Sequence, residues 1–134
     1  MTSTPGRTDK ILVVDDDARI RDLLRRYLTQ EGFEIFLAED GKSLTRILLR
    51  ETVDLIVLDL MMPTVNGFDV VAVLSERPET ARIPIVVVTA KEITSEDRAK
   101  LSGQVAAILE KAEFDGERFT SEVRRAMSGR EVAV

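Results

Sequence analysis

The chain has 134 residues, of which 44% are hydrophobic and 32% are charged, and its formal net charge is −5. These values fit one globular domain with its own core. The lack of cysteine and histidine excludes disulfides, thiolate metal sites and imidazole catalysis. The negative charge argues against a nucleic-acid-binding surface, and no apolar run suits a membrane span or a signal peptide. We therefore expect a cytoplasmic domain that contacts neither nucleic acid nor a membrane directly.

The first forty residues predict a tail followed by a strand, a helix and a second strand. Residues 1–9 are small and polar, which is typical of a flexible tail. The apolar run 10–14, bounded by polar residues, indicates a strand buried on both faces. From Ala18 the apolar residues recur three and four apart, which indicates a helix that Gly32 ends. Residues 33–38 form the second predicted strand.

The middle of the chain repeats this alternation. Helical spacing resumes at Leu44, Ile47 and Leu48, and the apolar run 54–59 predicts the third strand. Residues 61–67 predict a loop, and a helix then runs from Phe68 to Leu74. We expect the side chains of two residues to cap the first and third helices, namely Asp17 and Asn66.

The last part of the chain adds two more strands and two helices. The strands are predicted over 83–90 and 105–109, with a short polar helix over 95–101 between them. The final helix is predicted from Arg118 to Met127, and the residues from Ser128 onward are expected to fray. We place the domain at residues 10–128, with flexible tails at 1–9 and 129–134.

Strands that alternate with helices predict βαβ units. We therefore predict an α/β fold, a doubly wound (βα)5 arrangement in which a five-stranded parallel sheet carries helices on both faces. In such a sheet, sites form beyond the carboxyl ends of the strands. The residues at those ends are Asp15 and Asp16, Asp59, Thr89, and Lys111. Singly, each is readily explained as a helix cap or a solvated side chain, but together they predict a site.

The chemistry of this set is coherent. Clustered carboxylates repel one another unless a cation neutralises them, and a few oxygen ligands with room for water suit Mg²⁺. A carboxylate beside that cation is able to attack phosphorus and form an aspartyl phosphate. An ammonium group, here Lys111, stabilises the transferring phosphoryl group, and Thr89 is able to donate a hydrogen bond to it. None of these steps requires histidine or cysteine from this chain.

Three segments resemble the receiver domains of two-component response regulators. They are ILVVDDD at 11–17, DLIVLDLMMPTVNGF at 54–68, and IVVVTA at 85–90. The central D-L-M-M-P-x-x-N-G motif is highly specific, and the match extends in order from about Lys10 to Met127. The resemblance implies the flavodoxin-like fold of the chemotaxis regulators. The polar segment 92–103 resembles the form found in receivers attached to hybrid sensor kinases.

The resemblance also implies the role of each site residue. Asp59 is the phosphoacceptor, and Mg²⁺ is bound by Asp16, by Asp59 and by the backbone carbonyl of Met61, with Asp15 assisting through water. Lys111 pairs with the phosphoryl group, and Thr89 responds to it. The donor is a phosphohistidine on a sensor histidine kinase or a histidine phosphotransfer protein. Such a domain is not an enzyme, although it promotes its own phosphotransfer and a slow autodephosphorylation.

Four residues depart from the usual pattern of the family. Ala112 follows Lys111 where proline is usual, and because a cis bond without proline costs about 3 kcal/mol, we expect a trans peptide and an altered loop. Ile108 stands where an aromatic residue often changes rotamer together with the threonine. Met61, two residues beyond Asp59, is unable to orient an attacking water. Together with Lys91, two residues beyond Thr89, this predicts a long-lived phosphoryl group, with a half-life longer than seconds.

Three other functions use a similar fold or similar residues. A phosphatase of the haloacid dehalogenase kind needs a second carboxylate two residues beyond its nucleophile, where this chain has Met61. A dinucleotide-binding fold needs a glycine-rich turn where Asp15 and Asp16 stand. A pseudo-receiver, which keeps the fold for protein contacts and is not phosphorylated, remains open, and Ile108 and Ala112 are its only support.

The output of the domain is predicted only in outline. After the final helix the chain ends, so we expect the signal to pass to an unidentified protein target. The resemblance implies that this target binds the face formed by the fourth helix, the fifth strand and the fifth helix. Each exposed candidate there is better explained as solvated surface than as a contact residue, and the candidates are Arg98, Lys100, Arg118 and Glu122.

Overall fold

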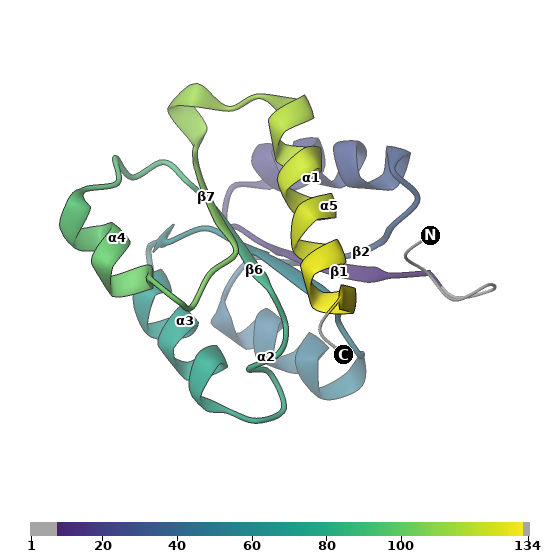
Figure 1. The fold of residues 1–134 in the computed structure, drawn as a ribbon, viewed down its shortest axis with the longest axis horizontal. Coiled ribbons are helices and arrows are strands. Elements are labelled where there is room, and N and C mark those ends of the chain that lie inside the picture. The colour runs from purple at the N-terminus through teal and green to yellow at the C-terminus, as the bar shows by residue number, and fades with distance from the viewer. Residues whose placement is uncertain (1–7, 133–134) are drawn as a thin grey trace.

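The computed structural model describes the backbone of residues 8–132 and the side chains of residues 8–128. Figure 1 shows a central sheet with helices on both of its faces. The sheet has five parallel strands in the order β2–β1–β3–β6–β7. Their bounds are Lys10–Val14 for β1, Glu34–Ala38 for β2, Leu55–Leu58 for β3, Ile85–Thr89 for β6 and Ala107–Glu110 for β7. The predicted doubly wound α/β fold is confirmed.

Five helices cover the two faces of this sheet. Helices α1 (Ala18–Gln30) and α5 (Gly116–Val132) lie on one face. Helices α2 (Gly41–Arg50), α3 (Gly67–Glu76) and α4 (Ser95–Leu101) lie on the other. Among the described residues, no helix has the length and apolarity that crossing a membrane would require.

Alternate residues of the strands build two separate cores. In β1, Leu12 and Val14 pack toward α2, α3 and α4, whereas Ile11 and Val13 pack toward α1 and α5. Every residue of β3 is buried, which explains why its sequence is continuously apolar rather than alternating. Because each fully buried aliphatic side chain contributes about 1.5–3 kcal/mol, the central strands hold the sheet edge in place.

Local sequence signals set the ends of the helices as predicted. The Asp17 side chain accepts a hydrogen bond from the N–H of Arg19, and the Asn66 side chain accepts one from the N–H of Phe68. Gly32, with φ at 93°, follows α1 in the left-handed region that glycine tolerates. The Asp17 and Asn66 caps satisfy N–H groups that the helices themselves leave without partners.

The predicted loop at 61–67 was wrong in part. It contains a small antiparallel hairpin, in which β4 (Met61–Met62) pairs with β5 (Val65–Asn66). A Cβ at Gly67 would lie 2.3 Å from the Cα of Leu60, so only glycine allows the hairpin to close against the end of β3. The two-residue strands are too short to carry a period of two that a sequence pattern would reveal.

Other predicted bounds also needed correction. Helix α5 begins at Gly116 and runs to Val132, so Ser128 and the residues up to Val132 are helical rather than frayed. Asp9, assigned to the flexible tail, is buried, and its carbonyl accepts a hydrogen bond from Glu34 N–H at 3.0 Å. The fifth strand lies at Ala107–Glu110 rather than 105–109. The rest of the predicted tails, residues 1–7 and 133–134, lies outside the described residues.

The altered loop after β7 agrees with expectation. The described residues contain no cis peptide, so the bond between Lys111 and Ala112 is trans. The chain turns there through a short 3-10 helix, η1 (Lys111–Glu113), before α5 begins. This turn keeps Lys111 directly at the end of β7.

Candidate functional site

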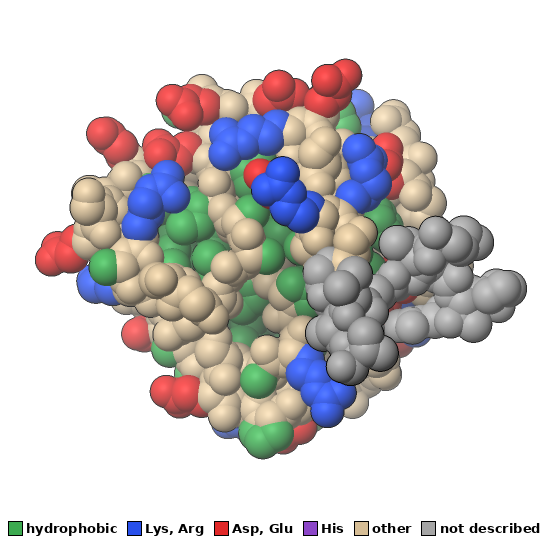
Figure 2. Space-filling model, viewed as in Figure 1, with side chains coloured by type: hydrophobic (Ala, Val, Ile, Leu, Met, Phe, Trp, Pro, Cys, Tyr) green, Lys and Arg blue, Asp and Glu red, His purple; other side chains and the backbone are tan. Residues whose placement is uncertain are grey.

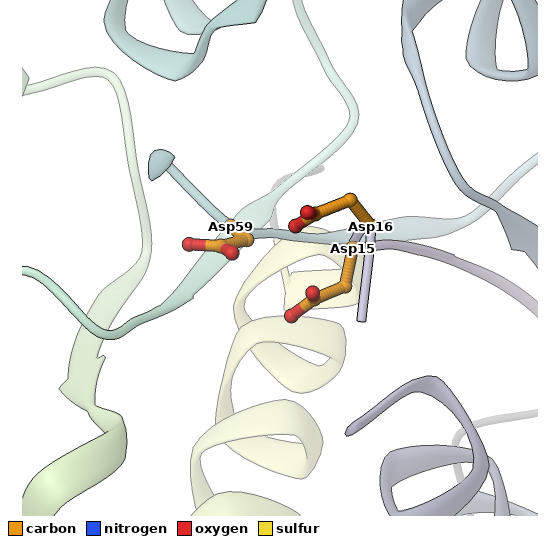
Figure 3. Close-up of side chains that lie close together, drawn as sticks. All are labelled: Asp15, Asp16 and Asp59. Atoms are coloured by element: carbon orange, nitrogen blue, oxygen red, sulfur yellow. The ribbon is translucent and has the colours of Figure 1, made fainter. Parts of the chain in front are cut away.

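Three carboxylates meet at the carboxyl edge of the sheet. Asp15 and Asp16 follow β1, Asp59 follows β3, and these strands are neighbours in which Val14 pairs with Leu58. One carboxylate oxygen of each residue lies within 4.8 Å of the others. Figure 3 shows the three side chains extending from the two strand ends toward the same side. Asp15 and Asp59 are buried, and Asp16 is exposed to solvent.

Lys111 brings a positive charge into this cluster from the far edge of the sheet. Its Nζ lies 2.8 Å from Oδ2 of Asp15 and 3.2 Å from Oδ2 of Asp59. Lys111 follows β7, which is separated from β3 by β6. Its long side chain therefore crosses the end of β6, and the structure places it between the two buried acids.

Burial and the ion pair act on the pKa values of this cluster in opposite directions. Burial raises the pKa of the Asp15 carboxyl above its ordinary value, although Lys111 and the N–H of Asp17 pull it down. Burial alone would lower the pKa of Lys111, but Asp15 and Asp59 raise it overall. Lys111 therefore carries its charge at neutral pH.

The main chain holds the two buried carboxylates rigidly. Oδ1 of Asp59 accepts a hydrogen bond from Met61 N–H at 3.0 Å, while the N–H of Asp59 donates to the carbonyl of Val14. Oδ1 of Asp15 accepts a hydrogen bond from Asp17 N–H at 2.9 Å. Each of these acids thus keeps one oxygen on the backbone and turns the other toward Lys111.

Thr89 stands at the end of β6, between the strand that carries Asp59 and the strand that precedes Lys111. It is fully buried, and its Oγ1 accepts a hydrogen bond from Lys91 N–H at 3.2 Å. A hydroxyl that accepts in this way still has its proton to donate. Thr89 is therefore placed as a donor at the sheet edge that the acids share.

The donor set fits a divalent magnesium ion. Two buried carboxylates and one exposed carboxylate face a single ammonium group, which leaves the cluster with surplus negative charge. Carboxylate oxygens are the ligands that Mg²⁺ prefers in proteins, with water filling the remaining positions. The exposed Asp16 also lines a hollow of about 640 Å³ beside the β4–β5 hairpin, which opens this side of the cluster to solvent.

Two contacts near the site are not evident from the sequence. The Nη1 of Arg21 in α1 donates to the carbonyl of Asp15 at 2.6 Å and so fixes the turn after β1. The Nζ of Lys91 lies 2.9 Å from Oδ2 of Asp97 in α4. Only the position of Arg21 one turn into the helix hinted at the first contact, and no pattern predicted the second.

The chain is similar to known proteins whose family agrees with this geometry. Residues 11–124 match the family model of the response regulator receiver domain. ResD of Bacillus subtilis, a transcriptional regulatory protein, is 49% identical over 82 residues, which are 61% of this chain and 33% of ResD. CpxR of Klebsiella pneumoniae, another such protein, is 42% identical over 83 residues, 62% of this chain and 34% of CpxR. This chain thus matches about a third of the length of these relatives.

Solved structures agree with this family. A receiver domain from Methanospirillum hungatei superposes with a TM-score of 0.85 at 19% identity, over 96% of this chain and 100% of that one, and supports the fold alone. TrrA of Thermotoga maritima, a response regulator solved in complex with Mg²⁺ and BeF, has a TM-score of 0.76 at 30% identity, over 89% of this chain and 99% of TrrA. The protein described here belongs to the response regulator receiver domain family, a family of signalling domains.

Proposed function

We propose that this chain is the phosphoacceptor switch of a two-component phosphorelay and that Asp59 receives the phosphoryl group. The observation that carries the proposal is the position of Lys111, whose Nζ lies within 3.2 Å of Oδ2 of Asp59 and also pairs with Asp15. A buried carboxylate beside a charged ammonium group is suited to attack phosphorus and to hold the product.

In the transfer, an oxygen of Asp59 forms a bond to phosphorus while the bond from phosphorus to the imidazole nitrogen of the donor breaks. The electron pair of the broken bond stays on the imidazole, which takes up a proton. Lys111 neutralises charge on the phosphoryl oxygens, and Thr89 donates a hydrogen bond to one of them. The backbone N–H of Met61 keeps the Asp59 carboxylate oriented throughout.

Mg²⁺ would be held by Asp16, by Asp59 and by the backbone carbonyl of Met61, with Asp15 contributing through water. When bound, it neutralises charge on the carboxylates and on the phosphoryl oxygens. The spacing of the three acids within 4.8 Å supports this assignment.

Donor and target are proposed from the family. The donor would be a sensor histidine kinase or a histidine phosphotransfer protein in the cytoplasm, which supplies the imidazole that this chain lacks. The target would be a protein that binds the face formed by α4, β7 and α5. Figure 2 shows hydrophobic side chains gathered over the middle of that face, with Lys and Arg side chains around them. We propose that the receiver unit extends beyond the predicted residues 10–128 to take in the buried Asp9 and the end of α5 at Val132.

The phosphoryl group is proposed to be long-lived. The Met61 side chain is 54% exposed and has no group that would hold a water in line for attack on phosphorus. Autodephosphorylation would therefore be slow, and the domain would act as a switch rather than as an enzyme with turnover.

Intact mass spectrometry tests the proposal. The chain is incubated with Mg²⁺ and a small phosphodonor, and one added phosphoryl group is expected on the wild type and none on Asp59→Asn. Asp69→Asn serves as the matched control, because this exposed aspartate in α3 is not one of the clustered acids and should leave the reaction unchanged. A wild-type protein that gains no phosphoryl group would support the pseudo-receiver function instead.

A further inference from the structure

The start of α4 is held by a buried carboxylate that the phosphorylation site does not use. The Asp97 side chain is only 9% exposed, and its Oδ2 lies 2.9 Å from Nζ of Lys91. The same oxygen accepts a hydrogen bond from Thr94 N–H at 3.0 Å, while the N–H of Asp97 donates to Oγ1 of Thr94. Lys91, together with Thr94, holds the pKa of Asp97 down at about 2, so the carboxylate stays charged.

Lys91 connects this anchor to the phosphorylation site through its backbone. Its N–H donates to Oγ1 of Thr89 at 3.2 Å, two residues earlier in the chain. That bond occupies a lone pair of the hydroxyl and leaves its proton free for another acceptor. The direction of the Thr89 O–H therefore depends on where the backbone of Lys91 lies.

Apart from Ile93, which packs against the core, the loop between β6 and α4 is largely open to solvent. Ala90, Glu92 and Thr94 are exposed, and α4 is a helix of only seven residues. The ion pair from Lys91 to Asp97 spans the whole loop and ties its first turn to the first turn of α4. Loss of this pair would let the Lys91 N–H drift from the Thr89 hydroxyl.

We propose that Asp97 is a positioning residue for phosphotransfer, which acts through Lys91 to hold the Thr89 hydroxyl ready to donate to the phosphoryl group on Asp59. This inference rests on the proposed function, because it requires Asp59 to be the phosphoacceptor. Asp97 touches none of the reacting atoms. Its effect is to fix the orientation of the Thr89 hydroxyl before the phosphodonor binds.

Two variants remove the ion pair between Lys91 and Asp97 while keeping the neighbouring hydrogen bonds to Thr89 and Thr94. Asp97→Asn retains a side-chain oxygen to accept the Thr94 N–H, and Lys91→Met retains the backbone N–H that reaches Thr89. A partly exposed ion pair is worth at most about fivefold in a rate. Each variant should therefore be phosphorylated by a small phosphodonor, at saturating Mg²⁺, about threefold to fivefold more slowly than wild type.

The combined variants test whether the effect passes through Thr89. The Asp97→Asn, Lys91→Met double variant should be no slower than either single variant, because both remove the same contact. In a Thr89→Ala background, Asp97→Asn should have no further effect on the rate. In the otherwise wild-type chain, Lys91→Arg should keep the wild-type rate, since the guanidinium retains the ion pair with Asp97. Glu96→Gln, which removes an exposed charge from the same turn of α4, should react like wild type.

Each outcome decides the matter. Wild-type rates in both single variants would overturn the inference, as would a loss of rate with Asp97→Asn that persists in the Thr89→Ala background. Thermal unfolding identifies a variant that fails to fold, and Lys91→Met, which leaves the cap of α4 intact, then decides. A wild-type chain that takes no phosphoryl group would overturn the proposed function and this inference together. A chain that is phosphorylated at the same rate with and without the Lys91–Asp97 ion pair would overturn this inference alone.

Discussion

The two sides of the sheet are built differently. On one side, every residue of β3 is buried, as is every residue of β1 after Lys10, and backbone hydrogen bonds hold Asp15 and Asp59, which follow these strands. On the other side, β7 is only partly buried, and α4 begins on the reciprocal cap between Thr94 and Asp97 and on the ion pair from Asp97 to Lys91. The acids are thus held by the main chain, whereas Lys111 and the loop that follows the buried Thr89 are held by individual ion pairs that substitution can remove.

The largest effect is expected from Lys111→Ala, which removes the one charge that joins the two halves. We expect phosphorylation to slow by about 10²–10³-fold, as when a transition-state donor is lost. Mg²⁺ should bind more tightly to this variant, because Asp15 and Asp59 lose their competing partner. Stopped-flow phosphorylation and Mg²⁺ titration measure the two effects, and a variant that bound Mg²⁺ more weakly would contradict this reading.

Packing variants should show the same contrast in stability. Leu58→Ala, at a fully buried position in β3, should lower the free energy of unfolding by about 2–5 kcal/mol. Ile108→Ala, at a partly buried position in β7, should cost about 1 kcal/mol, because less area leaves water on folding. Urea unfolding compares the two, and equal losses would show that the halves do not differ.

The lifetime of the phosphoryl group tests whether Met61, in the hairpin beside Asp59, slows autodephosphorylation. Met61→Asn should shorten the half-life by roughly tenfold, less than a general base contributes, because an amide orients water without taking its proton. The decay of the phosphorylated mass over time gives both half-lives. A wild-type half-life of seconds would contradict the assignment of Met61.

Acid titration gives the smallest effect and the most local one. The folded pKa of Asp97 lies at about 2, below the ordinary value of 3.8. Its stabilising contribution is therefore complete above pH 3.8 and is lost as the pH falls through 2. Carboxyl NMR should find this low pKa in wild type and a higher one in Lys91→Met, and an unchanged value would show that the pair does not form.

The residues at the strand ends could be predicted from the sequence because the geometry of the sheet is periodic. Parallel strands place the residues that follow them at one edge, so Asp15, Asp16, Asp59 and Lys111 were expected to converge before their distances were known. The strands themselves were evident because burial on both faces leaves a continuous apolar run.

Features away from the strand ends escaped prediction because they depend on irregular loops, very short strands and polar helix ends. The pair of Lys91 with Asp97 depends on how residues 90–94 turn, which no hydrophobic period records. The hairpin at 61–66 is too short for a strand pattern. The end of α5 was placed too early because its last residues are polar, although the helix continues to Val132.

The central claim is that the acids and Lys111 together hold a phosphoryl group on Asp59. A crystal structure of this chain with Mg²⁺ and beryllofluoride, which mimics that group, tests the claim most directly. We predict beryllium bonded to an Asp59 oxygen, Mg²⁺ on Asp16 and Asp59, and fluorides in contact with Lys111 Nζ and Thr89 Oγ1. Beryllofluoride bound elsewhere, or Lys111 still paired only with Asp15, would contradict the account.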